Sequence, residues 1–216
     1  PMILCNLYSE LGDLVDQQER IKIAEECVDQ IFNHFYDSKK KIIRENVFTD
    51  GKFSDSFDGR LINPGHGLEA MWFIMNLGEE YKRDEWINKS IQIALNIVDH
   101  GWDNEMKGIF YFLDSDGHSP QQLEWNQKLW WVHLEALICF LRGYELSGSN
   151  KCFEWFQKIY TYTWSNFRDS NGGEWYGYLQ RNGDKLLNLK GGKWKGCFHV
   201  PRALLILSQI SKRLNI

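Results

Sequence analysis

Three histidines recur at nearly the same interval along the chain. His66, His133 and His199 follow one another at a spacing of about 66 residues, which is long enough for one structural repeat. Each falls near the start of a predicted apolar helix. A histidine at a helix N-terminus lies at the positive end of the helix dipole, which lowers its pKa and favours the neutral imidazole. Because a neutral imidazole can accept a proton, this recurrence indicates proton-transfer chemistry.

A capping or core role is the alternative for each of these histidines. The match to the repeat favours a functional role for His66 and His199. Both roles stay open for His133, which lies deeper in its motif. The other histidines, His34, His100 and His118, fall at helix ends and in a predicted hairpin.

Glu69 follows His66 by three residues, so the two share one face of a predicted helix. Glu69 can therefore orient the imidazole or tune its charge. It can equally bind a metal, but no third ligand stands at local spacing, and no metal site is predicted. The chain contains neither a GxSxG nucleophile motif nor a GxxxxGK[ST] phosphate loop, which disfavours serine nucleophiles and nucleotide hydrolysis.

The segment QQLEWNQKLWWVHLEAL concentrates charged side chains around paired tryptophans. Tryptophan faces stack on sugar rings, and charged groups bind hydroxyls. The alternative is a buried helix whose charged residues pair with one another. The candidate binding residues in this segment are Lys128, Trp130, Trp131 and Glu135.

The chain repeats with a fixed period. Segments starting at Asp37, Asp103 and Asp169 each end on Asp-Gly or Asn-Gly at the same offset, and their starts are evenly spaced at the same interval as the histidines. This signature is typical of repeat architectures, and the terminal glycines indicate hairpin edges.

Between these segments the sequence predicts two kinds of helix. Residues 19–36, 84–101 and 150–168 have one apolar face, whereas 66–78, 126–146 and 198–214 are apolar around more of their circumference. Pairs of outer and inner helices predict an all-α fold, an α/α toroid with short β-hairpins between the helix pairs. Because residues 1–12 fall in an inner-helix slot, the chain is expected to form about half of a ring of roughly six pairs.

Composition excludes other classes of protein. A net charge of −4 without basic runs disfavours nucleic-acid binding. The longest apolar run, ALICFL, is too short to span a bilayer, and no leader sequence is evident, which favours a cytoplasmic protein. Five widely spaced cysteines suggest reduced thiols rather than disulfides.

Four strings carry a resemblance to a known family: NPGHGLEAMWF, QLEWNQKLWWVHLEAL, GEWYGYL and KGGKWKGCFHVPRALL. They closely resemble the N-acyl-D-glucosamine 2-epimerase family, whose animal-type members are also called renin-binding protein. The resemblance covers residues 1–216 and implies the C-terminal half of an (α/α)6 barrel with three helix-pair repeats. It also implies an isomerase that interconverts N-acetylglucosamine and N-acetylmannosamine by deprotonation and reprotonation at C2.

The resemblance further implies roles for individual residues. His66 and His199 match the proposed acid/base pair of the family, with Glu69 supporting His66. Trp130 and Trp131 would line the sugar site, and Lys128, Glu135 and Arg202 are candidates to bind hydroxyls or a developing oxyanion.

The chemistry requires no cofactor, although family members suggest ATP as an allosteric activator. The implied partners are an amino sugar, the other half of the barrel, a second copy in a homodimer and the protease renin. Little or no activity is expected from this half alone.

Other functions stay open at this stage. A related aldose–ketose isomerase or a cellobiose-type epimerase would use the same residues. A carbohydrate hydrolase or lyase on the same toroid would use two carboxylates such as Glu69 and Glu135. A non-catalytic fragment that binds renin is a further alternative.

Overall fold

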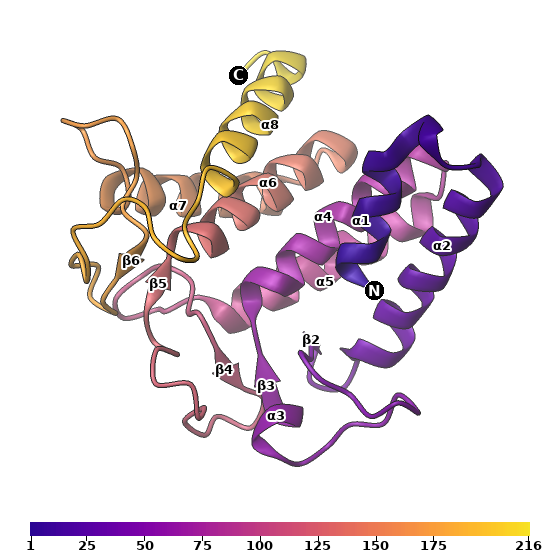
Figure 1. Ribbon diagram of the computed structural model, residues 1–216, viewed down its shortest axis with the longest axis horizontal. Coiled ribbons are helices and arrows are strands. Elements are labelled where there is room, and N and C mark those ends of the chain that lie inside the picture. Colours follow the sequence, from indigo (N-terminus) through magenta and orange to yellow (C-terminus); the bar gives the residue numbers. More distant parts are fainter.

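A computed structural model describes residues 1–216. The chain is mainly helical, with very short strands gathered at one end of the helix array (Figure 1). The longer helices are α1 (Met2–Leu11), α2 (Gln17–Gln30), α4 (Pro64–Glu80), α5 (Asp84–Gly101), α6 (Trp130–Ser147), α7 (Asn150–Asn166) and α8 (His199–Leu214). The shorter elements are a 3-10 turn (Gly12–Leu14), a π-helical turn (Ile31–Phe35), α3 (Phe57–Arg60) and the strands β1 (Tyr36–Asp37), β2 (Ile42–Ile43), β3 (Leu61–Ile62), β4 (Leu113–Asp114), β5 (Lys128–Leu129) and β6 (Tyr178–Leu179).

The helices form two layers, as the repeat predicts. Helices α1, α4, α6 and α8 follow one another in an inner arc, and α2, α5 and α7 lie outside it (Figure 1). The arc does not close into a ring. None of these helices combines the length and the apolar character needed to cross a membrane.

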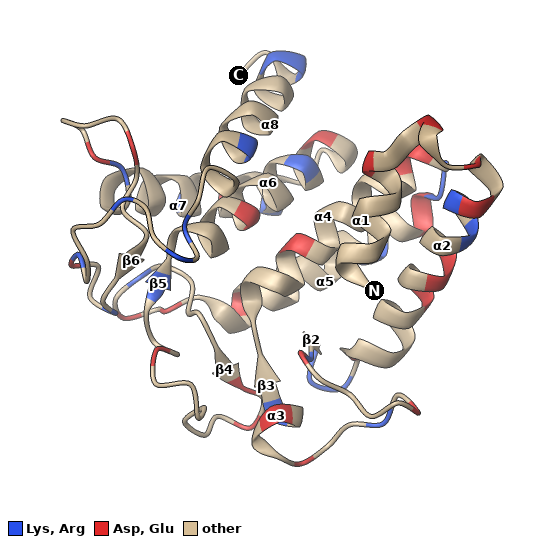
Figure 2. Ribbon diagram, viewed as in Figure 1, with Lys and Arg blue, Asp and Glu red and all other residues tan.

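The two kinds of helix differ in burial as their sequences indicate. Helices α4 and α6 are buried around most of their circumference, and their ribbons carry few charged residues, whereas α2 carries many (Figure 2). Helix α5 buries a single stripe, which includes Ile93, Ala94, Ile97 and Val98. Together these faces form one hydrophobic core, in which α4 and α6 contribute the largest share.

Local signals define where the inner helices begin and end. The Asn63 side chain accepts a hydrogen bond of 3.2 Å from the His66 N–H and so caps α4, and Pro64 occupies the first turn. Helix α6 ends at Gly148, which adopts a left-handed φ of 67°. The predicted inner helix at 126–146 begins later, at Trp130, because Lys128 and Leu129 form strand β5.

The strands form more pairs than the predicted hairpins. Asp37 and Asp103 each accept hydrogen bonds from the N–H groups two and three residues later, which closes a tight turn at the start of the segment. This turn joins β1 to β2 in the first repeat, and isolated antiparallel bridges recur at the matching positions of the next two repeats, between Trp102 and Ile109 and between Arg168 and Trp175. The remaining strand pairs, β3 with β4 and β5 with β6, join successive repeats.

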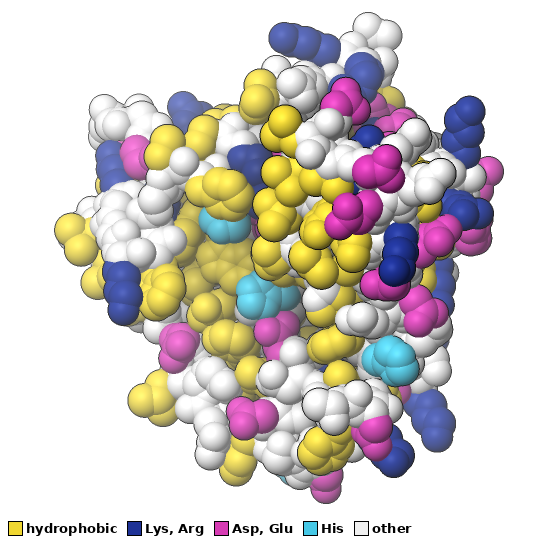
Figure 3. Space-filling view, turned by 45° about the vertical axis from the view of Figure 1, so that its right-hand side comes forward, with side chains coloured by type: hydrophobic (Ala, Val, Ile, Leu, Met, Phe, Trp, Pro, Cys, Tyr) yellow, Lys and Arg dark blue, Asp and Glu magenta, His cyan; other side chains and the backbone are white.

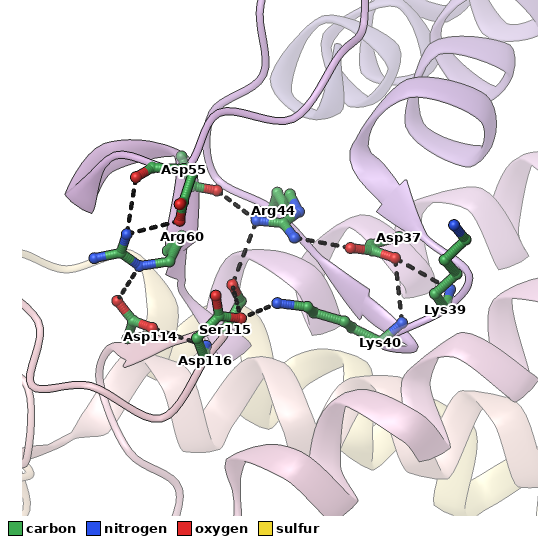
Figure 4. A network of polar contacts seen from close by, with 10 residues as sticks. Asp37, Lys39, Lys40, Arg44, Asp55, Arg60, Asp114, Ser115 and Asp116 are labelled. Carbon is green, nitrogen blue, oxygen red and sulfur yellow. Dashed lines mark hydrogen bonds and ion pairs between the residues drawn. The ribbon is translucent and has the colours of Figure 1, made fainter.

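A polar network fastens the loops at this end of the molecule (Figure 4). The Arg44 guanidinium donates to Asp37 Oδ2 at 2.8 Å and to the Gly59 carbonyl at 2.7 Å, and both Arg44 and Asp37 are buried. Arg60 donates to Asp114 at 3.0 Å, which links α3 to β4. These contacts hold the loop after β2 against the segment that leads into α4.

The buried Arg44–Asp37 pair should be important for stability. Asp37→Ala is expected to destabilise the chain by roughly 3–5 kcal/mol, because it leaves a buried guanidinium without its carboxylate. Urea denaturation measures this change. Asp50→Ala is the matched control, since Asp50 forms an exposed pair with Lys52, and it should leave the free energy of unfolding nearly unchanged. Equal losses for the two variants would contradict this interpretation.

Candidate active site

His66 lies in the first turn of α4 and is tied to a carboxylate from another loop. Its Nδ1 is 2.9 Å from Glu45 Oε2. The imidazole is 43% exposed, so it remains accessible from the concave side of the arc. With Nδ1 occupied by the carboxylate, Nε2 is the nitrogen left to exchange a proton.

His199 is the first residue of α8 and has a similar arrangement. Its Nδ1 lies 2.7 Å from Glu135 Oε1. Glu135 is fully buried in α6, whereas the His199 side chain is 21% exposed. Both histidines are therefore oriented by a carboxylate on Nδ1 and leave Nε2 free.

Trp131 lies between the two histidines. Its ring centroid is 5.1 Å from that of His66 and 5.7 Å from that of His199, and both interplanar angles are close to 30°. The indole thus brings together two imidazoles that belong to different repeats and lie far apart in the chain. It also gives a flat apolar face between two groups able to exchange protons.

Hollows adjoin each of these imidazoles. A cavity of about 370 Å³ beside His199 is lined mainly by aromatic side chains: Tyr111, Trp130, Trp131, Tyr178 and Trp194. A second hollow of about 220 Å³ beside His66 is lined by apolar residues of α1, β2 and the π-helical turn, together with Glu45. In Figure 3 histidine side chains lie at the edge of a hollowed surface floored by hydrophobic residues.

Two buried carboxylates behind the histidines share one guanidinium. Arg202 Nη2 donates to Glu69 Oε1 at 3.0 Å and to Glu135 Oε1 at 2.5 Å, and Trp72 Nε1 donates to Glu135 Oε2 at 2.9 Å. Burial, together with the charge of Glu135, raises the pKa of Glu69. Burial acts to lower the pKa of Arg202, but the two carboxylates outweigh it and raise that pKa.

This cluster has atoms that could coordinate a cation. Ligand atoms of Glu69, Glu135 and His199 lie within 4.8 Å of one another. Arg202 already supplies a positive charge at this point, and it bonds both carboxylates. Arg202 therefore offsets part of the negative charge of this cluster.

Of the two roles predicted for Glu69, orienting His66 or tuning its charge, the structure shows the second, because Glu69 acts on His66 through its charge and Glu45 is the hydrogen-bonded partner. Two other predictions need correction. The pKa of His66 is raised rather than lowered: burial acts to lower it, but the hydrogen bond and charge of Glu45 outweigh burial. Glu135 lies behind His199 and is fully buried, so it cannot reach a sugar hydroxyl.

Lys128 and His133 do not reach the hollows. Lys128 is completely buried, and its Nζ lies 3.1 Å from Asp103 Oδ2. Burial lowers the pKa of Lys128 to about 8, against the opposing effect of Asp103. His133 bonds the Leu129 carbonyl at 2.7 Å and accepts from the Ile109 N–H at 2.9 Å, which identifies it as a core residue.

The other candidates lie where the sequence predicts a site. Trp130 and Trp131 line the aromatic cavity, and Arg202 Nη2 lies 3.4 Å from His199 Nδ1. The sequence analysis missed Glu45, Trp72 and the aromatic residues contributed by neighbouring loops. Glu45 lies in an irregular segment, so no periodicity could have indicated it.

Comparisons with known proteins identify the family of this chain. Residues 2–203 match the N-acylglucosamine 2-epimerase (GlcNAc 2-epimerase) family. The chain is 42% identical to the N-acylglucosamine 2-epimerase of Mus musculus over 97% of this chain and 51% of the mouse protein. It thus spans about half the length of the curated relatives it matches.

Solved structures of sugar-converting enzymes share the fold. A D-mannose isomerase superimposes with a TM-score of 0.79 at 17% identity, covering 95% of this chain and 54% of the isomerase. A cellobiose 2-epimerase from Bacillus thermoamylovorans gives a TM-score of 0.75 at 23% identity, covering 97% of this chain and 50% of the epimerase. At such identities these matches show the α/α toroid architecture alone. The family match, extending over nearly the whole chain, confirms the resemblance seen in the sequence: this chain belongs to the N-acylglucosamine 2-epimerase family.

Proposed function

We propose that this chain carries the acid/base pair of a sugar 2-epimerase that interconverts N-acetylglucosamine and N-acetylmannosamine. The observation that carries the proposal is the pair of imidazoles beside Trp131, each anchored through Nδ1 to a carboxylate. A base on one face of a carbon and an acid on the other can invert it, and two such groups flanking a stacking surface supply this arrangement.

The reaction follows from this arrangement. Once the sugar ring is open, one imidazole removes the proton on C2, next to the aldehyde carbonyl. The electrons of the broken C–H bond pass into a planar enediolate, and the other imidazole returns a proton to the opposite face. Trp130 and Trp131 would hold the sugar, and Arg202 would add positive charge where the oxyanion develops.

Related reactions use the same intermediate. An aldose–ketose isomerase or a cellobiose-type epimerase also proceeds through an enediolate, so these are the second candidate functions. The likeness to the cellobiose 2-epimerase of Ruminococcus albus, 27% identical over 60% of this chain, favours this alternative over unrelated chemistry. A hydrolase based on Glu69 and Glu135 is disfavoured because both carboxylates are buried and bonded to Arg202.

The proposal extends to partners. Apolar side chains on the end helices of the arc remain exposed, among them Ile3, Leu4 and Leu7 of α1 and Leu204 and Leu205 of α8. Exposed apolar patches of this kind favour association, and we propose that further helices cover them in the working enzyme. ATP as an activator, a homodimer, binding to renin and a cytoplasmic location are proposed from the family resemblance.

The two histidines should be indispensable for epimerisation. A suitable context is a chimera in which this chain replaces the matching part of the mouse relative. His66→Asn or His199→Asn in that chimera should lower turnover by about a hundred- to ten-thousand-fold, because each removes one proton-transfer group. NMR of N-acetylmannosamine conversion measures the rate, and circular dichroism checks the fold.

His118→Asn is the control for these variants, since His118 is exposed and lies outside the site. It should leave turnover unchanged. A His66 or His199 variant with near-normal turnover would remove that residue from the mechanism.

The chain alone is expected to have little or no activity and to self-associate. Its sugar site is open on the concave side, and its end helices expose apolar side chains to water. Incubation with N-acetylmannosamine followed by NMR tests the first expectation, and light scattering tests the second. Clear product formation by a monomeric chain would refute this part of the proposal.

A further inference from the structure

Glu45 is fixed to the same stretch of backbone that presents His66. Its own N–H donates to the Leu61 carbonyl at 3.1 Å. Leu61 belongs to β3, which leads through Asn63 directly into α4 and His66. The carboxylate and the imidazole that it contacts are therefore positioned from one short segment.

The neighbouring residue strengthens this anchor. Arg44 precedes Glu45 and donates hydrogen bonds to Asp37, as Figure 4 shows, and to the Gly59 carbonyl. All of these groups are buried or half-buried, so the end of β2 has little freedom to move. The contact of 2.9 Å between Glu45 and His66 is thus a built feature of the loop rather than a chance approach of two mobile side chains.

The two carboxylate–imidazole pairs are chemically different. The Glu135 carboxylate also accepts hydrogen bonds from Arg202 and Trp72, so His199 shares it with two other donors. The Glu45 carboxylate forms no hydrogen bond or ion pair with any other side chain, so His66 is its one side-chain partner. A charge-assisted hydrogen bond of this kind stabilises the imidazolium.

The other charged groups around His66 do not reverse the effect of Glu45 on its pKa. Glu69 and Glu135 lie near enough to add further negative potential. Arg44 lines the same hollow, but its guanidinium is engaged with Asp37. Burial acts to lower the pKa of His66, and the surrounding carboxylates, Glu45 foremost, raise it overall.

We propose that Glu45 is a positioning residue that holds the His66 ring with Nε2 free and stabilises its protonated form, which favours His66 as the proton donor and His199 as the base in one direction of the reaction. The catalytic consequence rests on the proposed function. The effect of Glu45 on His66 does not, because it requires no sugar. Glu45 thus makes His66 differ from His199 in its tendency to hold a proton, a difference that the sequence repeat alone would not produce.

Titration of the full chain labelled with ¹⁵N-histidine tests this proposal. In the wild-type chain His66 should titrate above 6.5, the ordinary value for histidine, and should carry its proton on Nδ1 once neutral. Glu45→Gln keeps the shape and a hydrogen-bond acceptor but removes the charge, so the His66 midpoint should move to lower pH. Glu45→Asp restores the charge and should bring the midpoint back toward the wild-type value.

Glu25→Gln is the matched control, because it removes the same charge from an exposed ion pair on α2. It should leave the His66 midpoint in place. The proposal is overturned if wild-type His66 titrates at or below 6.5, if Glu45→Gln leaves the midpoint unchanged, or if the control shifts it equally. Since the titration uses no substrate, loss of the epimerase proposal and loss of this one are separate outcomes.

Discussion

The site depends on the hydrogen bonds that the buried Glu135 carboxylate accepts. The carboxylate extends from α6 and receives hydrogen bonds from Trp72 on α4 and from His199 and Arg202 on α8, so it joins three inner helices at one point. An isolated carboxylate in this position would cost several kcal/mol. The Arg202 guanidinium offsets this cost by pairing with Glu135, and it also donates a hydrogen bond to Glu69. His199 is therefore oriented by a hydrogen bond that also helps to pair the buried charge of Glu135.

Repetition brings the histidines into the same region, but it does not make them equivalent. His133 and His199 belong to successive repeats, yet His199 is the first residue of α8 whereas His133 is the fourth of α6. The His133 ring packs against Tyr162 and Phe167 in the core, whereas His199 lines the aromatic cavity. His66 differs again, since its carboxylate partner comes from a loop rather than from an inner helix.

The sequence was sufficient for the helices and for part of the site. The one-sided apolar pattern of the outer helices and the nearly continuous apolar character of the inner ones predicted these elements, because they bury whole faces in a common core. The repeat placed residues 1–12 in an inner-helix slot, where α1 lies. Lys128 was misplaced because the predicted helix began at 126; in the structure Lys128 lies on β5, whose pairing with β6 turns its side chain toward Asp103. Glu45 could not be found, since its contact with His66 spans 21 residues and depends on an irregular loop held by Arg44.

The central claim is that two separate imidazoles act on opposite faces of one carbon. Epimerisation by the chimera in deuterium oxide tests it most directly, with the label at C2 followed by NMR at low conversion. If one histidine removes the proton and the other donates a different one, the product should carry deuterium at C2 while the remaining substrate keeps protium. Product that retains the substrate's own proton would show that a single group carries it across, and would contradict the account.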